Sequence, residues 1–159
     1  MASWNEIVAI VPDLAAKVEA SFDANVHKVM ATLRADGSPR LSGTEVDISL
    51  GEMWISSMAG ARKARDLQRD PRLAIHSAPI DATLKLPDCR VDGRAVEVTD
   101  PEEIDRWQRA SGKVEDLPDE PFHLFRLDLE EIACTTVVDD VLVIEWWRPE
   151  TGRRRAEHR

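Results

Sequence analysis

The sequence predicts a mainly β fold of the α+β class, in which six or seven antiparallel strands form a closed or nearly closed barrel with three short helices at its periphery. Two patterns in the 159-residue chain support this prediction. Most of the chain consists of short runs of apolar and β-branched residues separated by turn residues. The connections between these runs are mostly too short for the crossovers that a parallel sheet requires.

The first 24 residues contain sequence signals for helices. Ser3 and Glu6 have the spacing of a capping box, which marks a helix start. Three apolar residues then recur at every fourth position, as they do on one face of a helix. These residues are Leu14, Val18 and Phe22. Because Pro12 precedes them and proline is tolerated in a first turn, we expect an amphipathic helix over residues 12–24.

Three strands are expected next, joined by short turns into an antiparallel meander. They cover residues 26–34, 40–50 and 53–57. Residues 35–39, Ala-Asp-Gly-Ser-Pro, form a strong turn signal, and Gly51 with Glu52 turns the chain again. Residues 46–50 alternate apolar and polar side chains, which is typical of a strand with one buried face.

The second half of the chain continues this pattern. Helices are expected over residues 61–70, which Pro71 ends, and from Asp100 to about Ser111. The expected strands are residues 73–77, 90–99, 122–138 and 141–147. The expected loops are residues 78–89 and 112–121, each with two prolines. One domain is therefore predicted over residues 1–150, followed by a basic, mobile tail at residues 151–159.

The composition argues against several classes of protein. A net charge of −9 is unfavourable for a general nucleic-acid binder. No apolar run approaches the roughly 20 residues that span a bilayer, and the first residues lack a basic signal-peptide segment. Cys89 and Cys134 have no metal-ligand spacing, and neither do the histidines, so no metal site is expected. Two reduced thiols in a cytoplasmic protein are the simplest interpretation.

The most informative segment is the start of the expected helix at residues 61–70. Arg62 and Lys63 lie in its first turn, where the helix dipole favours Asp or Glu instead. Ser56 and Ser57 end the strand that precedes it. A bound anion would explain this arrangement, because free backbone N–H groups, hydroxyls and cations together form a phosphate site.

Several segments, in this order, carry a resemblance to a known family. They are Leu33–Arg40, Met53–Ser57, Arg62–Leu67, Asp70–Leu73 and Gly93–Ala95. The chain resembles the pyridoxamine 5′-phosphate oxidase-like family of flavin-binding split β-barrels over roughly residues 25–148. It is also similar to the branch of that superfamily that uses the deazaflavin coenzyme F420.

This resemblance implies that Ser56, Ser57, Arg62 and Lys63 contact the phosphate of a flavin. It also implies a cofactor contact for Thr44, and for Trp147 near the C-terminus, where the family has a tryptophan. Other positions depart from the oxidases themselves. The strand over residues 42–47 has lost its basic ends, and Asp88 lies close to the position of a family glutamine. The C-terminal Arg and His residues do not match the family spacing for pyridoxal phosphate.

The expected function is therefore a flavin-dependent oxidoreductase that binds FMN and transfers hydride to or from a small organic substrate. A reductase dependent on coenzyme F420 and a flavin-binding protein without activity are the alternatives. The resemblance implies a homodimer with the cofactor at the interface. The composition favours a cytoplasmic protein that has neither nucleic acid nor a membrane as a partner. The sequence identifies no catalytic residue, and the role of His76 stays open.

Overall fold

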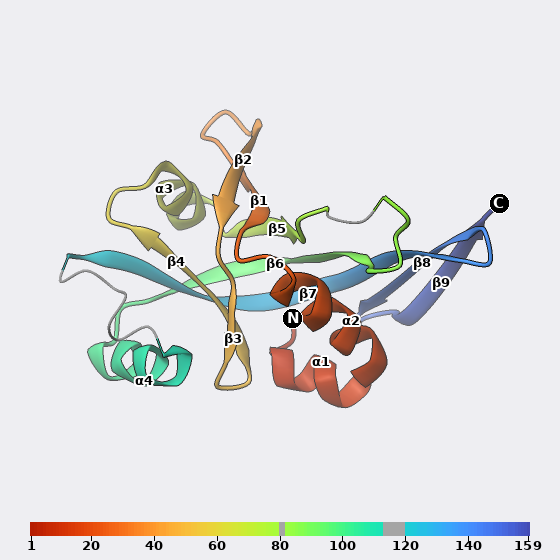
Figure 1. Cartoon of the computed structure of the whole chain (residues 1–159). Helices are drawn as coiled ribbons and strands as arrows, with labels where there is room; N and C mark the ends of the chain where they lie inside the picture. The colour runs from red at the N-terminus through yellow and green to blue at the C-terminus, as the bar shows by residue number, and fades with distance from the viewer. Residues whose placement is uncertain (80–81, 113–119) are drawn as a thin grey trace.

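The computed structural model describes residues 1–79, 82–112 and 120–159. The helices in these residues are α1 (Trp4–Ile10), α2 (Pro12–Asp23), α3 (Arg62–Arg69) and α4 (Pro101–Ser111). The strands are β1 (Lys28–Leu33), β2 (Pro39–Thr44), β3 (Asp47–Ser49), β4 (Glu52–Met58), β5 (Arg72–His76), β6 (Asp88–Val98), β7 (Phe122–Val138), β8 (Val141–Arg148) and β9 (Gly152–His158). Every strand pairing among them is antiparallel, which confirms the predicted class (Figure 1).

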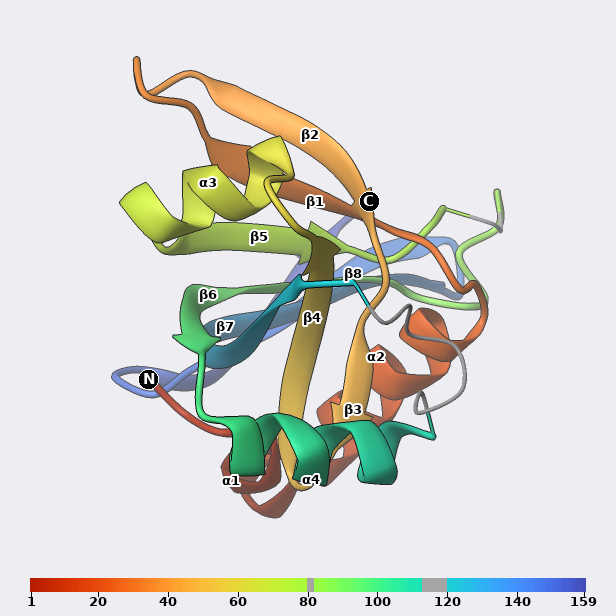
Figure 2. The same ribbon diagram turned by 90° about the vertical axis from the view of Figure 1, so that its left-hand side faces the viewer.

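The sheet is a split barrel whose two ends are adjacent in the sequence. Its strand order is β2-β1-β5-β6-β7-β4-β3. The terminal strands β2 and β3 are separated only by Glu45 and Val46, so the chain itself joins the two ends of the sheet. Figure 2 shows β2 and β3 as two successive stretches of one path, the first beside β1 and the second beside β4.

The expected meander over residues 26–57 has the predicted antiparallel neighbours, because β2 pairs with β1 and β3 pairs with β4. The single strand expected over residues 40–50 is wrong, since the chain divides it into β2 and β3 at opposite ends of the sheet order. The other edge of β4 pairs with β7. The reason is burial: Met53, Trp54 and Ile55 are 0–3% exposed, so β4 has packing partners on both faces and occupies an interior position in the sheet.

Strand β7 connects the barrel to an extension. It pairs with β6 along most of its length, while Phe122–Arg126 also pair with β4 and Ile132–Val138 pair with β8. Figure 1 shows β8 and β9 extending away from the helices, with the C-terminus at the far end. The β7–β8 turn uses Asp139 and Asp140, both with positive φ, as a tight hairpin of this type requires.

The C-terminal segment differs from the expected mobile tail. Gly152–His158 form strand β9, which pairs with β8 through seven positions from Leu142 to Arg148. Its side chains also bind the body of the protein, because Arg153 Nη2 lies 2.6 Å from Glu145 Oε1 and 2.8 Å from Asp13 Oδ2. Pairing with a neighbouring strand satisfies the backbone polar groups of this segment even though its sequence is polar.

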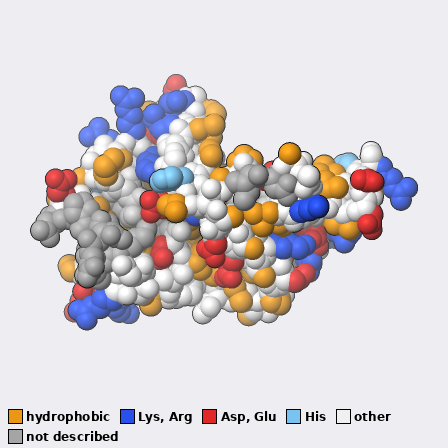
Figure 3. All heavy atoms as spheres, in the orientation of Figure 1, with side chains coloured by type: hydrophobic (Ala, Val, Ile, Leu, Met, Phe, Trp, Pro, Cys, Tyr) orange, Lys and Arg blue, Asp and Glu red, His pale blue; other side chains and the backbone are white. Residues whose placement is uncertain are grey.

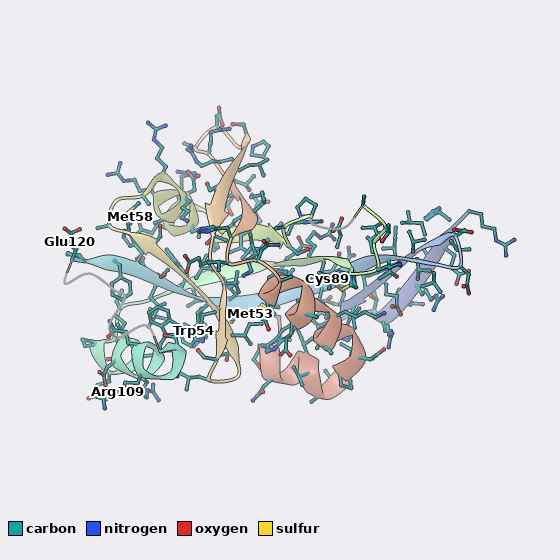
Figure 4. All side chains as sticks on the ribbon, in the orientation of Figure 1. Met53, Trp54, Met58, Cys89, Arg109 and Glu120 are labelled. Carbon is teal, nitrogen blue, oxygen red and sulfur yellow. A yellow bond between two sulfur atoms is a disulfide. The ribbon has the colours of Figure 1, made fainter. Side chains whose placement is uncertain are left out.

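The helices cover two separate hydrophobic clusters. The main core includes Ile7 of α1 and Leu14 of α2, and it reaches Ala64 and Leu67 of α3. A smaller cluster, which includes Trp54, Trp107 and Leu124, lies beneath α4. Figure 4 labels Met53 and Trp54, neighbours on β4, which belong to the main core and to the smaller cluster respectively. This alternation fixes which side of β4 each following residue faces.

The N-terminal helices agree with the sequence signals. Ser3 and Glu6 form the complete capping box at the start of α1. Helix α2 covers Pro12–Asp23, within one residue of the expected range, and Leu14, Val18 and Phe22 are all buried. The described part of the chain therefore contains four helices where three were expected, because the capping box begins a separate short helix before Pro12.

The two cysteines contradict the expectation of free thiols. Cys89 and Cys134 lie directly opposite each other on β6 and β7, with their Cα atoms 4.2 Å apart, and they form a disulfide. Both are buried, at 0% and 2% exposure. The antiparallel register places these side chains on the same face, although 45 positions separate them in the sequence. The argument for a cytoplasmic location from two reduced thiols therefore no longer holds.

A bulge in β7, where Glu130 is the extra residue, allows the sheet to bend. The register between β6 and β7 shifts between Asp92 and Gly93. A Cβ atom on Gly93 would lie 2.3 Å from the carbonyl oxygen of Asp128, closer than real contacts allow. Glycine is therefore required here because the backbone of β7 passes too close for any side chain.

Candidate anion-binding site

The candidate site forms where β4 passes into α3. Strand β4 ends at Met58, and Gly60 turns the chain with φ of +70°, a conformation that suits glycine. The N–H of Ala61 donates to the carbonyl of Met58 at 3.1 Å, and α3 begins at Arg62. Ala64 and Leu67 pack into the main core, so the opposite face of α3 carries its charged residues outward.

The start of α3 has no side-chain cap. Its N-cap residue is Ala61, which provides no hydrogen-bond acceptor, and its first turn holds no acidic residue. The backbone N–H groups at this end therefore lack the partners that Ser, Thr, Asp or Asn usually supply. The electrostatic anomaly expected from the sequence is present in the structure, and an anion would satisfy both the amides and the helix dipole.

The two serines of β4 face opposite sides of the sheet. Ser56 lies across from Leu124 and follows Trp54, so it faces the smaller cluster beneath α4. Ser57 follows Ile55 on the face of the main core, which α3 covers. The Oγ of Ser57 is buried and has no hydrogen-bond partner within the described residues. Of the two, Ser57 is the hydroxyl on the side of α3.

Lys63 joins the site to the edge of the barrel. Its Nζ donates to the carbonyl oxygen of Gly43 on β2 at 2.8 Å. Thr44, the next residue, is buried at 3% exposure and lies at the end of the same strand. Burial lowers the pKa of Lys63, while the nearby charge of Glu45 acts in the opposite direction. A partly desolvated ammonium gains more from an anion than an exposed one does.

An arginine-lined pocket adjoins this site on the outer face of α3. It has a volume of about 370 Å³. Its charged lining residues are Arg34, Asp36, Arg40, Arg62, Arg65, Asp66 and Arg69. Figure 3 shows Lys and Arg side chains gathered over α3 and the β1–β2 hairpin. Although the chain has a net charge of −9, the five arginines around this pocket create a local positive potential that attracts anions.

Asp66 organises part of this pocket. Its carboxylate accepts from Arg40 Nε at 2.6 Å, from Thr32 Oγ1 at 2.9 Å and from Arg69 Nη2 at 3.1 Å. By contrast, Arg62 and Arg65 make no hydrogen bond or ion pair within the part of the chain that the structure describes. These two guanidinium groups are therefore available to a ligand.

The structure does not bring Trp147 together with the other predicted site residues. Trp147 is 3% exposed and belongs to the main core. Its neighbour Trp146 projects from the other face of β8 and lines a different pocket. Adjacent residues of a strand face opposite sides of a sheet, so only one of the two can be buried in this core.

Sequence reasoning missed a polar cluster beside the turn at Gly60. His123 of β7 accepts a hydrogen bond at Nε2 from the Gly60 N–H at 3.3 Å, and its Nδ1 lies 2.7 Å from Glu97 Oε1. Gln68 of α3 donates to the same carboxylate at 3.0 Å. These contacts hold the turn that precedes α3. No sequence spacing connects His123 with Glu97, because the β6–β7 register alone brings them together.

The fold is that of a split-barrel protein, with a candidate anion site between β4 and α3. A family model described as Pyridoxamine 5′-phosphate oxidase matches residues 14–135, which is more than half of the chain. The chain therefore belongs to the pyridoxamine 5′-phosphate oxidase-like family. No curated protein matches it by sequence.

Solved structures show the same fold in distant proteins. PhzG from Burkholderia lata 383, in complex with tetrahydrophenazine-1-carboxylic acid, has a TM-score of 0.68 and 14% identity, with 97% of this chain and 92% of that chain covered. The protein Atu2129 of unknown function from Agrobacterium tumefaciens has a TM-score of 0.64 and 20% identity, with 93% and 63% covered. A heme binding protein from Mycobacterium smegmatis has a TM-score of 0.62 and 19% identity, with 92% and 58% covered. The chain thus spans less than two thirds of the length of the last two.

Among the described residues, no helix is long and apolar enough to cross a bilayer.

Proposed function

We propose that this protein is a flavin-dependent oxidoreductase that binds FMN through its phosphate and transfers hydride to or from a small organic substrate. The observation that carries the proposal is the uncapped start of α3, beside the unpartnered Oγ of Ser57 and the partly buried ammonium of Lys63. These donors and charges suit a dianionic phosphate.

Each residue has a definite role in this proposal. Arg62 and Lys63 neutralise the phosphate, while Ser57 and the first N–H groups of α3 donate hydrogen bonds to it. Thr44 is a further donor at the end of β2. Ser56 and Trp147, expected from the resemblance, contribute less directly, because Ser56 faces α4 and Trp147 lies in the core. When bound, the isoalloxazine ring supplies the hydride chemistry, so the protein needs no strong acid or base of its own.

The arginine-lined pocket favours a second candidate, a reductase dependent on coenzyme F420. FMN carries one phosphate, whereas F420 carries a phosphodiester and a tail of carboxylates. Arg65 and Arg69 extend the positive surface of α3 beyond Arg62, toward Arg34 and Arg40. A cofactor with several anionic groups could use this extension, and FMN could not.

We further propose a homodimer with the cofactor at the interface. The face of the sheet opposite the main core carries exposed apolar residues that no described helix covers. They include Leu41 at 73%, Val29 at 41% and Val137 at 37% exposure. A two-fold interface would bury this face in both copies.

Absorbance spectroscopy and titration of the purified protein test the proposal. We expect FMN to bind with quenching of its fluorescence, and we expect turnover with NAD(P)H or a chemical reductant. Binding of F420 but not FMN would select the second candidate. Binding without turnover would support a flavin-binding protein that lacks activity, and binding of haemin alone would overturn all three.

A double variant tests the site itself. Arg62→Ala with Lys63→Ala should weaken FMN binding by about 2–4 kcal/mol, because two charge-assisted contacts are lost. Arg106→Ala with Arg109→Ala on α4 removes the same charge far from α3 and should leave the affinity nearly unchanged. Equal affinity in both double variants would refute the phosphate assignment.

A further inference from the structure

His123 of β7 lies against the turn that leads into α3. It is directly paired with Ser57 of β4, so the two side chains share the face of the sheet that α3 covers. Its Nε2 accepts the 3.3 Å hydrogen bond from the N–H of Gly60, the residue whose φ of +70° turns the chain toward α3. The imidazole therefore holds the backbone two residues before Arg62, where α3 begins.

The tautomer of His123 follows from its second contact. Its Nδ1 lies 2.7 Å from Oε1 of Glu97, and an ionised carboxylate only accepts hydrogen bonds. Nδ1 therefore carries the proton of the neutral ring, and the lone pair of Nε2 is left to accept from Gly60. Glu97 thus selects the tautomer that the turn requires.

Two further contacts fix the orientation of this pair. The ring of His123 lies against that of Phe125, with the ring centroids 6.2 Å apart and an angle of 25° between the planes. Gln68, in the last turn of α3, donates to both oxygens of Glu97, at 3.1 and 3.0 Å. The pair of His123 and Glu97 therefore secures α3 at both ends, through the Gly60 turn before it and through Gln68 near its C-terminus.

We propose that His123 is the positioning residue of the anion site. Together with Glu97, it keeps the Gly60 turn in the conformation that brings the free N–H groups of α3 and the hydroxyl of Ser57 to one anion. The proposal rests on the phosphate site of the proposed function, and it gives His123 a role through the backbone without contact to the ligand. Such support matters because binding groups must be held within about 0.5 Å of their productive positions.

Titration of the isotope-labelled full chain with inorganic phosphate tests this role without the flavin ring. We follow the amide resonances of the first three residues of α3, Arg62, Lys63 and Ala64, and expect phosphate to shift them. His123→Met removes the acceptor and should weaken phosphate binding about fivefold to tenfold, the value of one ordinary hydrogen bond. His123→Gln has nearly the same length and size as the Met variant, but its amide oxygen can accept from Gly60. It should bind phosphate almost as well as the natural sequence does.

The ring nitrogen resonances of His123 give a second measurement, because they distinguish a proton on Nδ1 from one on Nε2. We expect the proton on Nδ1 at about pH 8, where an unperturbed imidazole is neutral. His158→Gln is the control variant, since His158 ends β9 at the opposite side of the molecule from α3 (Figure 1), and its phosphate affinity should not change. Equal phosphate affinities of His123→Gln and His123→Met, or a neutral ring with its proton on Nε2, would overturn the proposal.

FMN affinity, measured on the same samples, separates this proposal from the proposed function. If phosphate binding depends on the acceptor at position 123 but FMN does not bind, the flavin assignment alone fails. If FMN binds equally well to His123→Gln and His123→Met, the positioning role fails and the flavin assignment stands. No shift of the α3 amides with either ligand would overturn both.

Discussion

Arg40 on β2 donates a hydrogen bond of 2.6 Å from Nε to Oδ2 of Asp66 on α3, and the Asp66 side chain is only 4% exposed. This contact attaches the site helix to the strand at one end of the sheet order. Thr32 of β1 and Arg69 of α3 donate to the same carboxylate. A single buried acid thus connects three elements around the candidate site.

The variant Asp66→Asn should lower the free energy of unfolding by about 2–3 kcal/mol, because it weakens hydrogen bonds between charged groups and leaves guanidinium groups without a counter-charge. Urea denaturation measures this change. Asp70→Asn provides the control, since Asp70 pairs with Arg72 at the surface and should contribute little. If Asp70→Asn lost about 2–3 kcal/mol of unfolding free energy and Asp66→Asn lost none, the stabilising role assigned to Asp66 would be contradicted.

The same residue should make the stability of the protein depend on pH. Burial by itself would raise the pKa of Asp66, but hydrogen bonds from Arg40, Arg69 and Thr32 outweigh it and lower the pKa below its usual value. A lowered pKa means that this stabilisation is present above the unfolded-state pKa of about 3.9 and is lost as the pH falls through the folded-state value. Asp66→Asn should therefore lose less stability than the natural sequence between about pH 5 and pH 2.

The disulfide between Cys89 and Cys134 should stabilise the fold. It closes a loop across a sequence separation of 45 positions, and in the chain-entropy model such a loop is worth about 4 kcal/mol, within a usual range of about 2–5. We expect the double variant Cys89→Ala with Cys134→Ala, or the reduced protein, to unfold at lower denaturant. Intact mass under non-reducing conditions checks the bond directly, and two reactive thiols in the unreduced, denatured protein would contradict it.

Gly93→Ala tests the close contact between β6 and β7 beside the β7 bulge. The added methyl group would lie 2.3 Å from the Asp128 carbonyl, so β6 and β7 must separate. We expect a loss of about 2–3 kcal/mol in unfolding free energy, as for other overpacked sites. Gly43→Ala is a matched control on β2, where a Cβ atom meets nothing within 4 Å. Its stability should stay close to that of the natural sequence.

Strand β9 should be protected from hydrogen exchange. Its amides pair with β8, so residues 153–157 should exchange more slowly than an unstructured terminus. Arg153→Ala should reduce this protection and cost about 1–2 kcal/mol, because Glu145, whose side chain is 7% exposed, loses one of its cationic partners. Arg155→Ala removes only a contact with Glu157 on the same strand and should change little. Exchange at the rate of a free peptide would show that the segment is a tail after all.

Local patterns in the sequence were sufficient for most elements. The four-residue spacing of Leu14, Val18 and Phe22 predicted α2, and the uncapped, cationic first turn of α3 was evident from Arg62 and Lys63. Both features depend on residues within one or two helical turns. The class of fold followed from the short connections between strands, and the structure confirms it.

These local patterns do not predict which residues from distant parts of the sequence face each other in the sheet. Cys89 meets Cys134 only because of the β6–β7 register. Strand β9 has no apolar alternation, because it forms through backbone pairing with β8 and through the ion pairs of Arg153 with Glu145 and Asp13. The resemblance implied a cofactor contact for Trp147, but strand parity places Trp147 in the core and Trp146 at a pocket. One sheet face cannot be told from the other until the pairing is known.

The contact between Lys63 and Gly43 also has a consequence for solubility. Strand β2 ends the sheet order, and strands at the end of a sheet present backbone groups that can recruit another chain. Lys63 occupies one of these carbonyl groups with its ammonium. Lys63, which we assign to the phosphate, should therefore also hinder the pairing of β2 with another chain. Replacing Lys63 would remove a phosphate contact and uncover the Gly43 carbonyl at the same time. Affinity losses in Lys63 variants therefore have to be measured on protein whose monodispersity has been checked.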